Sequence, residues 1–259
     1  MLKTAKVNKN DILYDLGCGD GRIVITAAKK FGARGVGIDI NPERISESRE
    51  NAAKEGVEDK VQFIEQDLFE ANIREATVVS LYLLPSVNLK LRPKLFRELK
   101  PGTRMVSHDF NMGEWEPDQS LNFDNDYDIQ YDFDNHNVYF WILPANVSGT
   151  WEWTMSSGAE QNHHYLHLNQ KFQKLKGNLT EGESKISLKN ITIKGDSLHF
   201  VCEQYINGEK TIRTYTGFVN DDTITGNIVT QTNAVLKEAV WKARRDPSTI
   251  IPFKKSNAD

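Results

Sequence analysis

The chain has 259 residues and a formal net charge of −4; 39% of its residues are hydrophobic and 26% are charged, enough for two modest cores. No apolar run is long enough to span a bilayer, no signal-peptide pattern opens the chain, and two cysteines give no disulfide framework, so we expect a soluble protein of the cytoplasm. Residues 1–145 hold 18 Lys and Arg against 24 Asp and Glu, and the remainder holds 14 against 12. Neither half is clearly basic, which argues against DNA or large RNA as a partner.

The first predicted elements are a buried strand, "ILYDL", and a helix, "RIVITAAKKF", which a glycine ends. Between them Gly17, Gly19 and Gly21 stand at alternate positions, which favours a turn whose backbone N–H groups approach a ligand. Arg22 stands where a dinucleotide fingerprint needs its third glycine, and no phosphate-binding G-K-[ST] follows, so a nicotinamide oxidoreductase is disfavoured. Taken alone, this motif also fits a glycine turn that binds nothing.

The next elements repeat the strand-then-helix order. "ARGVGIDI" predicts a second strand that ends in Asp39, and Asn41 and Pro42 suit the start of a helix that ends at Gly56. "KVQFIEQDLF" predicts a third strand that ends in Asp67. A carboxylate at the end of the second strand is well placed for a ribose diol, although either aspartate alone could be a helix cap or a solvated charge.

Asp15 followed by G-x-G-x-G, with Asp39 and Asp67 after it, resembles the first motifs of class I (seven-strand) S-adenosylmethionine-dependent methyltransferases. "YDLGCGDGRIVITAAKKFGARGVGIDI" together with "LYLLPSVNLKLRPKLFRELKPGTRMVSHDF" is similar to a bacterial branch related to seven-strand protein lysine methyltransferases, which include the mitochondrial ATP-synthase c-subunit type and the histone type without a SET domain. The resemblance implies a Rossmann-like α/β domain over residues 1–145, with a mostly parallel seven-stranded sheet. It also implies that S-adenosylmethionine is bound by Asp15, Gly17, Cys18, Gly19, Gly21, Asp39, Ile40, Asp67, Leu68 and Ser80.

The start of the chain, "MLKTAKVNKND", is typical of the tail of a helix that leads into the first strand. Related family members carry a further upstream segment that helps to cover the cofactor. We therefore expect either a naturally short start or missing residues upstream of Met1, and a removed leader would change the expected location.

The methyl acceptor of this fold lies past the ends of the fourth and fifth strands, which are "VVSLYLLP" and "MVSHDFNMGEW" here. The first stretch lacks the Asn/Asp-Pro-Pro-aromatic pattern of methyltransferases that act on bases or glutamine. Tyr82 is a candidate wall of an amine channel, with core packing as the alternative. His108 and Asp109 are candidates for a base or a pocket wall, with a hydrogen-bonded strand end as the alternative.

The pattern changes near Pro144, after which about eight short alternating segments follow one another with turns between them. They predict a second domain, residues 146–259, built as a small antiparallel barrel or sandwich with a short polar tail. The pattern resembles small lipocalin-type barrels, and closure would bring together Trp151, Trp153 and Trp241.

Two polar stretches do not predict metal sites. In "HHYLH", neighbouring histidines point to opposite faces of a strand, and His163 and His167 stand about 13 Å apart at the usual strand rise. The segment "DNDYDIQYDFD" has Ile129 and Asn135 where a calcium loop needs glycine and glutamate, so we expect an acidic, solvated hairpin. We therefore expect no metal ion.

The leading hypothesis is an enzyme that transfers a methyl group from S-adenosylmethionine to a protein lysine or another amine, with a protein or amine as partner. The alternative is a cofactor-binding module without catalysis that binds a ligand or partner through its barrel. The sequence does not identify the acceptor, the ligand of the barrel or the oligomeric state.

Overall fold

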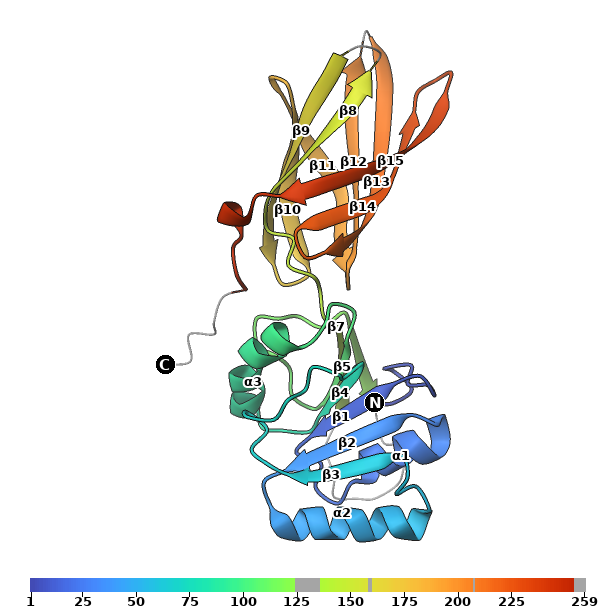
Figure 1. Ribbon diagram of the computed structural model, residues 1–259, viewed down its shortest axis with the longest axis vertical. Coiled ribbons are helices and arrows are strands. Elements are labelled where there is room, and N and C mark those ends of the chain that lie inside the picture. Colours follow the sequence, from blue (N-terminus) through green and yellow to red (C-terminus); the bar gives the residue numbers. More distant parts are fainter. Residues whose placement is uncertain (124–135, 158–159, 207, 254–259) are drawn as a thin grey trace. The chain divides into compact units, whose positions relative to one another are not determined.

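The computed structural model describes residues 1–123, 136–157, 160–206 and 208–253, and they form two compact units (Figure 1). The N-terminal unit is Met1–Leu143 and the barrel unit is Pro144–Phe253. The expected acidic hairpin at 124–134 lies outside the described residues. In the described parts of the chain, no helix has both the length and the apolar character needed to cross a membrane.

The N-terminal unit is built on a seven-stranded sheet in the order β3-β2-β1-β4-β5-β7-β6. Strands β1 to β5 are mutually parallel, and β7 runs antiparallel to both of its neighbours. The strands are β1 (Ile12–Leu16), β2 (Arg34–Asp39), β3 (Val61–Glu65), β4 (Val78–Leu81), β5 (Arg104–His108), β6 (Gln119–Phe123) and β7 (His136–Ile142). The helices are α1 (Arg22–Phe31), α2 (Pro42–Glu55) and α3 (Pro85–Glu98). The predicted Rossmann-like α/β sheet is confirmed.

Local sequence explains where these elements begin and end. The side chain of Asn41 accepts hydrogen bonds from the first N–H groups of α2, Pro42 occupies the first turn, and Gly56 ends the helix at a left-handed φ of 63°. Gly32 ends α1 in the same way, at a φ of 71°. The start of the chain matches the expected tail of a helix: Ala5 N–H donates to Met1 O at 3.0 Å and Val7 N–H to Leu2 O at 3.1 Å, and Lys6 ends the turn at a left-handed φ of 51°.

The strand order fixes where a ligand can bind. From β1 the chain proceeds outward to β2 and β3, and then returns to place β4 on the other side of β1. In open α/β sheets the crevice beyond the carboxyl ends of the strands at such a reversal is the usual ligand site. The carboxyl ends of β1 and β4 are therefore the place to examine for chemistry.

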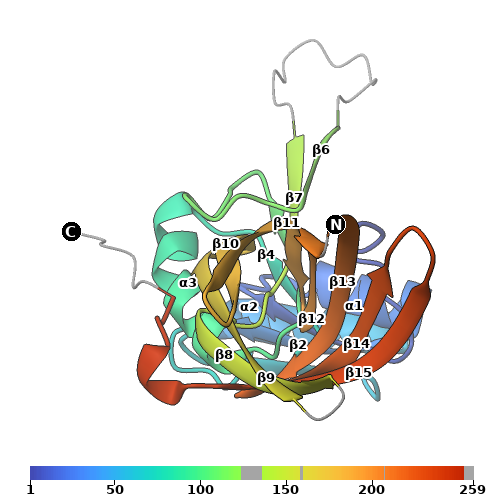
Figure 2. The same cartoon turned by 90° about the horizontal axis from the view of Figure 1, so that it is seen from above.

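The barrel unit contains eight antiparallel strands that close on themselves in the order β10-β11-β12-β13-β14-β15-β8-β9. Figure 2 shows these strands winding around a common centre. Closure selects a barrel over the sandwich that the alternation also allowed. The strands are β8 (Gly149–Ser157), β9 (Glu160–Lys171), β10 (Lys174–Glu181), β11 (Ser184–Lys194), β12 (Ser197–Ile206), β13 (Glu209–Asn220), β14 (Thr223–Gln231) and β15 (Leu236–Arg245), followed by a 3-10 turn η1 (Pro247–Thr249).

Aromatic side chains fill the interior of the barrel. The rings of Trp153 and Trp241 lie 5.0 Å apart between centroids, and Tyr215 stacks on Phe200 at 4.5 Å. Trp151 is buried in the same apolar cluster, and the guanidinium of Arg245 lies 4.8 Å above its ring. Large rings packed in this way exclude water and contribute much of the burial that stabilises a small barrel.

Candidate active site

The glycine turn between β1 and α1 is the floor of the site. All three glycines have positive φ angles, 81° at Gly17, 53° at Gly19 and 78° at Gly21. A Cβ atom on Gly17 would lie 2.6 Å from Leu83, and one on Gly21 would lie 2.7 Å from the ring of Phe63. Nothing lies within 4 Å of a Cβ at Gly19. The outer glycines are therefore required by packing and backbone conformation, whereas the middle one leaves open space for a ligand against the backbone.

Asp39, the last residue of β2, holds this turn in place. One carboxylate oxygen accepts the N–H of Gly19 at 3.0 Å, and the other accepts the N–H of Asn41 at 2.9 Å. The side chain is partly exposed, so its remaining lone pairs face the open space near Gly19. Asp39 thus combines a structural bond to the turn with free acceptor capacity beside it.

Three more of the predicted cofactor residues follow the carboxyl ends of β2 and β3. Ile40 leaves 70% of its surface exposed, which is unusual for an isoleucine that follows a buried strand. β3 ends at Glu65, two residues earlier than expected, and Asp67 follows it with its carboxylate accepting the N–H of Phe69 at 2.8 Å. Asp67 and Leu68 are both partly exposed. Apolar surface and carboxylate oxygens are therefore available together here.

A buried carboxyl group lies behind the turn. Asp15 on β1 is 2% exposed and accepts a hydrogen bond from the hydroxyl of Ser80 on β4 at 2.7 Å. Burial raises the pKa of Asp15 to about 7, and the nearby Asp39 and Asp20 carboxylates add to the rise, although the Ser80 bond opposes it. A carboxyl group in this state gains stability when a cation approaches, because a positive charge compensates the buried negative one.

Cys18 stands in the glycine turn, but it does not have the properties of a nucleophile. The thiol is buried, and burial together with the Asp15 and Asp39 carboxylates raises its pKa to about 12. The reactive form of cysteine is the thiolate, which is scarce at such a pKa. Its sulfur would lie 2.8 Å from a Cβ on Gly37, so Cys18 acts as a packing residue between the turn and β2.

The expected catalytic residues lie past the next two strands. Tyr82 follows β4, His108 is the last residue of β5, and their ring centroids are 4.4 Å apart in an edge-to-face arrangement. Tyr82 leaves 57% of its surface exposed. The core-packing alternative for Tyr82 is therefore wrong. Because β4 and β5 are parallel to β1, their carboxyl ends lie at the same edge of the sheet as the glycine turn.

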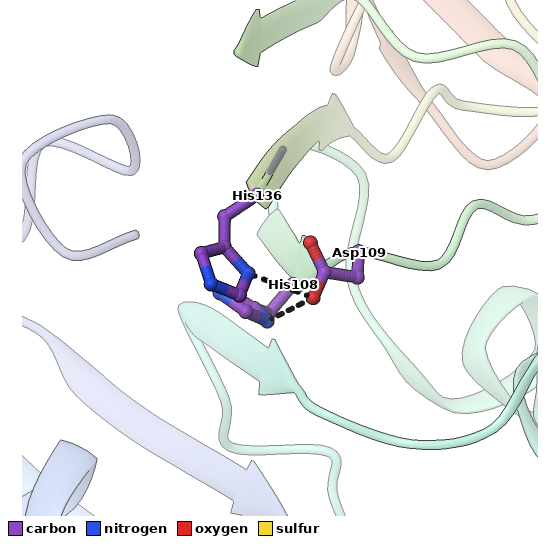
Figure 3. A group of neighbouring side chains, drawn as sticks. All are labelled: His108, Asp109 and His136. Carbon is purple, nitrogen blue, oxygen red and sulfur yellow. Dashed lines mark hydrogen bonds and ion pairs between the residues drawn. The ribbon is translucent and has the colours of Figure 1, made fainter. Parts of the chain in front are cut away.

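Figure 3 shows the polar group at this edge, which contains His108, Asp109 and His136. The Oδ2 atom of Asp109 lies 3.0 Å from Nδ1 of His108 and 3.2 Å from Nδ1 of His136. Oδ1 of the same carboxylate accepts the N–H of Asn137 at 2.8 Å. Asp109 has a left-handed φ of 59°, a conformation that is uncommon outside glycine but that aspartate adopts more readily than most residues.

His136 was not predicted from the sequence. It begins β7, which runs antiparallel to β5, so the amino end of β7 lies beside the carboxyl end of β5. The centroid distance between the His136 and His108 rings is 5.0 Å. The stretch "HNVYFWIL" predicted the strand but not its direction, and only the direction shows that its first residue joins the site.

The charges of this group follow from its surroundings. Partial burial lowers the pKa of His108, and His136 adds to the fall although Asp109 opposes it. Burial would raise the pKa of Asp109, but the N–H of Asn137 and the two imidazoles outweigh it and hold the pKa below its ordinary value. Near neutral pH the group therefore presents an uncharged His108 and a negative Asp109. The three possible ligand atoms lie within 4.8 Å of one another, close enough to hold one metal ion.

A glycine turn at the reversal of a parallel sheet, with one carboxylate at the end of the second strand and another beyond the third, is the arrangement expected of the class I methyltransferases. Residues 15–119 match the family described as "ANTKMT methyltransferase domain", and this match lies within the N-terminal unit. A "Protein-lysine N-methyltransferase" of Saccharolobus islandicus (strain REY15A) is 47% identical over 144 residues, which are 55% of this chain and 86% of that protein. The chain therefore belongs to this family of S-adenosylmethionine-dependent methyltransferases, as predicted, and S-adenosylmethionine is its cofactor.

Two further relatives are informative. The human lysine N-methyltransferase named for the ATP-synthase c-subunit is 40% identical over 106 residues, 41% of this chain and 45% of the relative, so the chain spans about half of its length. A crystal structure of an "RNA methyltransferase from Salinibacter ruber in complex with S-Adenosyl-L-homocysteine" is 55% identical in sequence and superimposes with a TM-score of 0.50. The matched region is 54% of this chain and 86% of the Salinibacter chain. The names of these relatives thus agree on the reaction and differ on the acceptor.

Proposed function

We propose that this chain transfers a methyl group from S-adenosylmethionine to the side-chain amine of a protein lysine. One observation carries the proposal: the cofactor turn and the group of Tyr82, His108 and Asp109 lie at the same edge of one sheet. Relatives named as lysine N-methyltransferases support the choice of acceptor. A location in the cytoplasm stays a prediction.

The reaction asks for orientation and electrostatics more than for covalent help. The amine nitrogen attacks the methyl carbon in line with the sulfur, the N–C bond forms as the S–C bond breaks, and S-adenosylhomocysteine leaves as a neutral sulfide. The lysine must first lose a proton to water. An aromatic, poorly hydrated wall lowers the pKa of an ammonium group and so assists that loss.

We assign the acceptor side to three residues. The negative charge of Asp109 attracts the incoming ammonium group, and the exposed face of Tyr82 stabilises it before its proton leaves. His108 packs edge-to-face against Tyr82, with ring centroids 4.4 Å apart, and so restricts the orientation of the tyrosine ring. None of the three residues needs to bond covalently to the substrate.

We assign the cofactor side to residues of the first four strands. The free acceptor capacity of Asp39 suits the ribose hydroxyls, Asp67 suits the adenine amino group, and the exposed apolar surface of Ile40 and Leu68 suits the faces of the base. Asp15, which accepts a hydrogen bond from Ser80, would compensate the positive charge of the sulfonium. These roles use the backbone of the glycine turn as the surface on which the cofactor lies.

A second candidate acceptor is RNA, because the relative of known structure from Salinibacter ruber is named an RNA methyltransferase. Residues 1–145 carry more acidic than basic side chains, which disfavours binding to a phosphate backbone. A role limited to cofactor binding is disfavoured by the family, whose named members are enzymes.

The decisive experiment is transfer of a labelled methyl group from S-adenosylmethionine into a lysate of the source cell by the purified full chain. We expect label that protease releases and ribonuclease does not, and methyllysine in the acid hydrolysate. Asp39→Ala provides a cofactor-deficient control. Label released by ribonuclease would show that the acceptor is RNA. A lysate that stays unlabelled, with normal cofactor binding in calorimetry, would support the alternative in which the chain binds the cofactor without catalysis.

A further inference from the structure

The group of His108, Asp109 and His136 has the composition and spacing of a metal site. The three possible ligand atoms are two imidazole Nδ1 atoms and one carboxylate Oδ2. The carboxylate oxygen lies 3.0 and 3.2 Å from the two nitrogens. Ligand bonds of about 2.0–2.2 Å in a tetrahedron place ligand atoms about 3.3–3.6 Å apart, and the two nitrogen–oxygen separations are close to that range.

Hydrogen bonding accounts for only one of the two contacts, that of His136 Nδ1 with Asp109 Oδ2 at 3.2 Å. Nδ1 of His108 is buried and makes no hydrogen bond, although it lies 3.0 Å from the Asp109 carboxylate. A ring nitrogen that does not donate presents a lone pair, and a lone pair that faces a carboxylate oxygen at this distance is repelled unless a cation lies between the two atoms. The contact is therefore better explained by a shared ligand than by a pair.

A backbone hydrogen bond orients the Asp109 carboxylate and leaves its Oδ2 atom available to a ligand. Oδ1 of Asp109 is occupied by the N–H of Asn137, and the left-handed backbone of Asp109 turns Oδ2 toward both histidines. Bonds of this kind orient the ligands of many metal sites and are as important as the ligands themselves. The side chains of His108, Asp109 and His136 are 21%, 24% and 31% exposed, so an ion can enter from solvent.

We propose that His108, Asp109 and His136 bind a divalent transition-metal ion of the zinc class through Nδ1, Oδ2 and Nδ1. Two imidazoles with one carboxylate suit zinc, cobalt, nickel or ferrous iron, whereas magnesium and calcium prefer oxygen ligands throughout. Three protein ligands leave at least one coordination position open.

The bound ion has a consequence for the reaction, which rests on the proposed function. It neutralises the Asp109 charge that we assign to attraction of the ammonium group, and it occupies the acceptor side of the sheet edge. The cofactor residues Asp15 and Asp39 belong to β1 and β2 and are not ligands. The ion is therefore an inhibitor that competes with a cationic acceptor and leaves cofactor affinity unchanged.

Binding is tested without any acceptor, by titration of the metal-free full chain with Co²⁺. We expect visible d–d absorption that saturates at one ion per chain and disappears on addition of Zn²⁺. Affinity should fall at least tenfold in His136→Ala and in Asp109→Asn. His163→Ala is the matched control, because His163 is an exposed strand histidine of the barrel unit. Circular dichroism and calorimetry with S-adenosylhomocysteine verify that each variant is folded.

Two results would overturn the site: no d–d bands in the wild-type chain, or equal Co²⁺ affinity in the wild type and His136→Ala. The inhibitory role is read separately, from methyl transfer with and without Zn²⁺ at several acceptor concentrations. We expect an increased KM with unchanged kcat in the wild type, and no Zn²⁺ effect in His136→Ala relative to its own zinc-free rate. Binding with no change in KM would overturn the inhibitory role alone, and failure of the chelator-treated enzyme to methylate lysine concerns only the proposed function.

Discussion

The two units contain carboxyl groups with opposite pKa shifts, the buried Asp15 and the partly buried Glu181. In the N-terminal unit, Asp15 accepts one bond from Ser80, and burial raises its pKa to about 7. In the barrel unit, burial would raise the pKa of Glu181 as well, but hydrogen bonds from His164 and Arg213 outweigh it and lower the pKa to about 2. Asp15 therefore has one hydrogen-bond donor, whereas Glu181 has a histidine and an arginine beside it.

The difference reflects what each carboxyl group faces. Glu181 on β10 bonds to Arg213 on β13, and these strands are not neighbours, so the ion pair crosses the barrel interior. Gln204 of β12 donates to the same carboxylate at 3.3 Å. Asp15 instead lies on β1, two residues before the glycine turn, in which a Cβ on Gly19 would meet nothing within 4 Å. A carboxylate that is paired within the protein stays ionised and becomes costly to leave unpaired, whereas a buried carboxyl group without a cation is suited to a ligand.

The largest expected effect concerns the independence of the units. A chain limited to Pro144–Phe253 should fold alone, because its aromatic cluster and its ion pair lie entirely within those residues. The amide spectrum of this fragment should be well dispersed and overlay that of the full chain at barrel positions. A collapsed spectrum would show that the barrel depends on the N-terminal unit and would end the comparison.

The second prediction uses the opposite pKa shifts. The folded pKa of Asp15, about 7, lies above the unfolded value near 3.8, so the N-terminal unit should lose stability as pH rises from 4 to 7, about 4 kcal/mol in all. The pKa of Glu181 is depressed, so its contribution is present above about pH 4.5 and is lost as pH falls toward 2. Thermal unfolding of the cofactor-free chain between pH 4 and 7 should show the first loss.

Asp15→Asn is the control for that experiment, since it cannot ionise and retains an oxygen for Ser80. Its stability should be flatter than that of the wild type over the same pH range. Parallel curves for the two proteins would mean that Asp15 is ionised in the folded state and that the contrast with Glu181 does not exist.

The third prediction concerns the ion pair of Glu181 and Arg213 in the barrel unit. Glu181→Ala leaves the Arg213 guanidinium without its partner in a mostly buried position, which should cost about 3 kcal/mol of unfolding free energy. Urea unfolding followed by tryptophan fluorescence measures it. The double variant Glu181→Leu/Arg213→Met should recover most of the loss, and cofactor affinity should remain that of the wild type. A loss below about 1 kcal/mol would show that water already screens the pair.

The features that the sequence predicts correctly are those that neighbouring residues in the chain decide. The glycine turn, the Asn41 cap and the alternation of the barrel strands each depend on residues a few positions apart. The sequence does not predict His136, because that residue is 27 positions from Asp109 and joins it only through an antiparallel strand. The pairing of Glu181 with Arg213 was missed for the same reason, since alternation shows which side chains point inward but not which of them meet.

The fourth prediction tests the cofactor side of the comparison. Asp39→Ala removes an acceptor that we assign to the ribose and also releases the N–H of Gly19, so cofactor affinity should fall by about 1–3 kcal/mol, up to a hundredfold. Titration calorimetry with S-adenosylhomocysteine measures it. Asp39→Asn keeps one oxygen for Gly19 and should lose less. Equal losses of cofactor affinity in the two variants would show that the charge of Asp39 matters and that its hydrogen bond to Gly19 does not.

The last prediction has the smallest expected effect and tests the acceptor side. Tyr82 is 57% exposed, so its removal exposes little new apolar surface and should cost little stability. Its neighbour His108 is the last residue of β5 and keeps its place in the sheet. We expect Tyr82→Ala to reduce kcat/KM for methyl transfer at least tenfold, about 1.4 kcal/mol of transition-state stabilisation, with cofactor affinity unchanged. Tyr82→Phe keeps the ring and should retain most of the activity, because a cation is stabilised by the aromatic face and not by the hydroxyl. If Tyr82→Ala loses cofactor binding and stability together, the ring supports the fold of this edge and is not the wall of an amine channel.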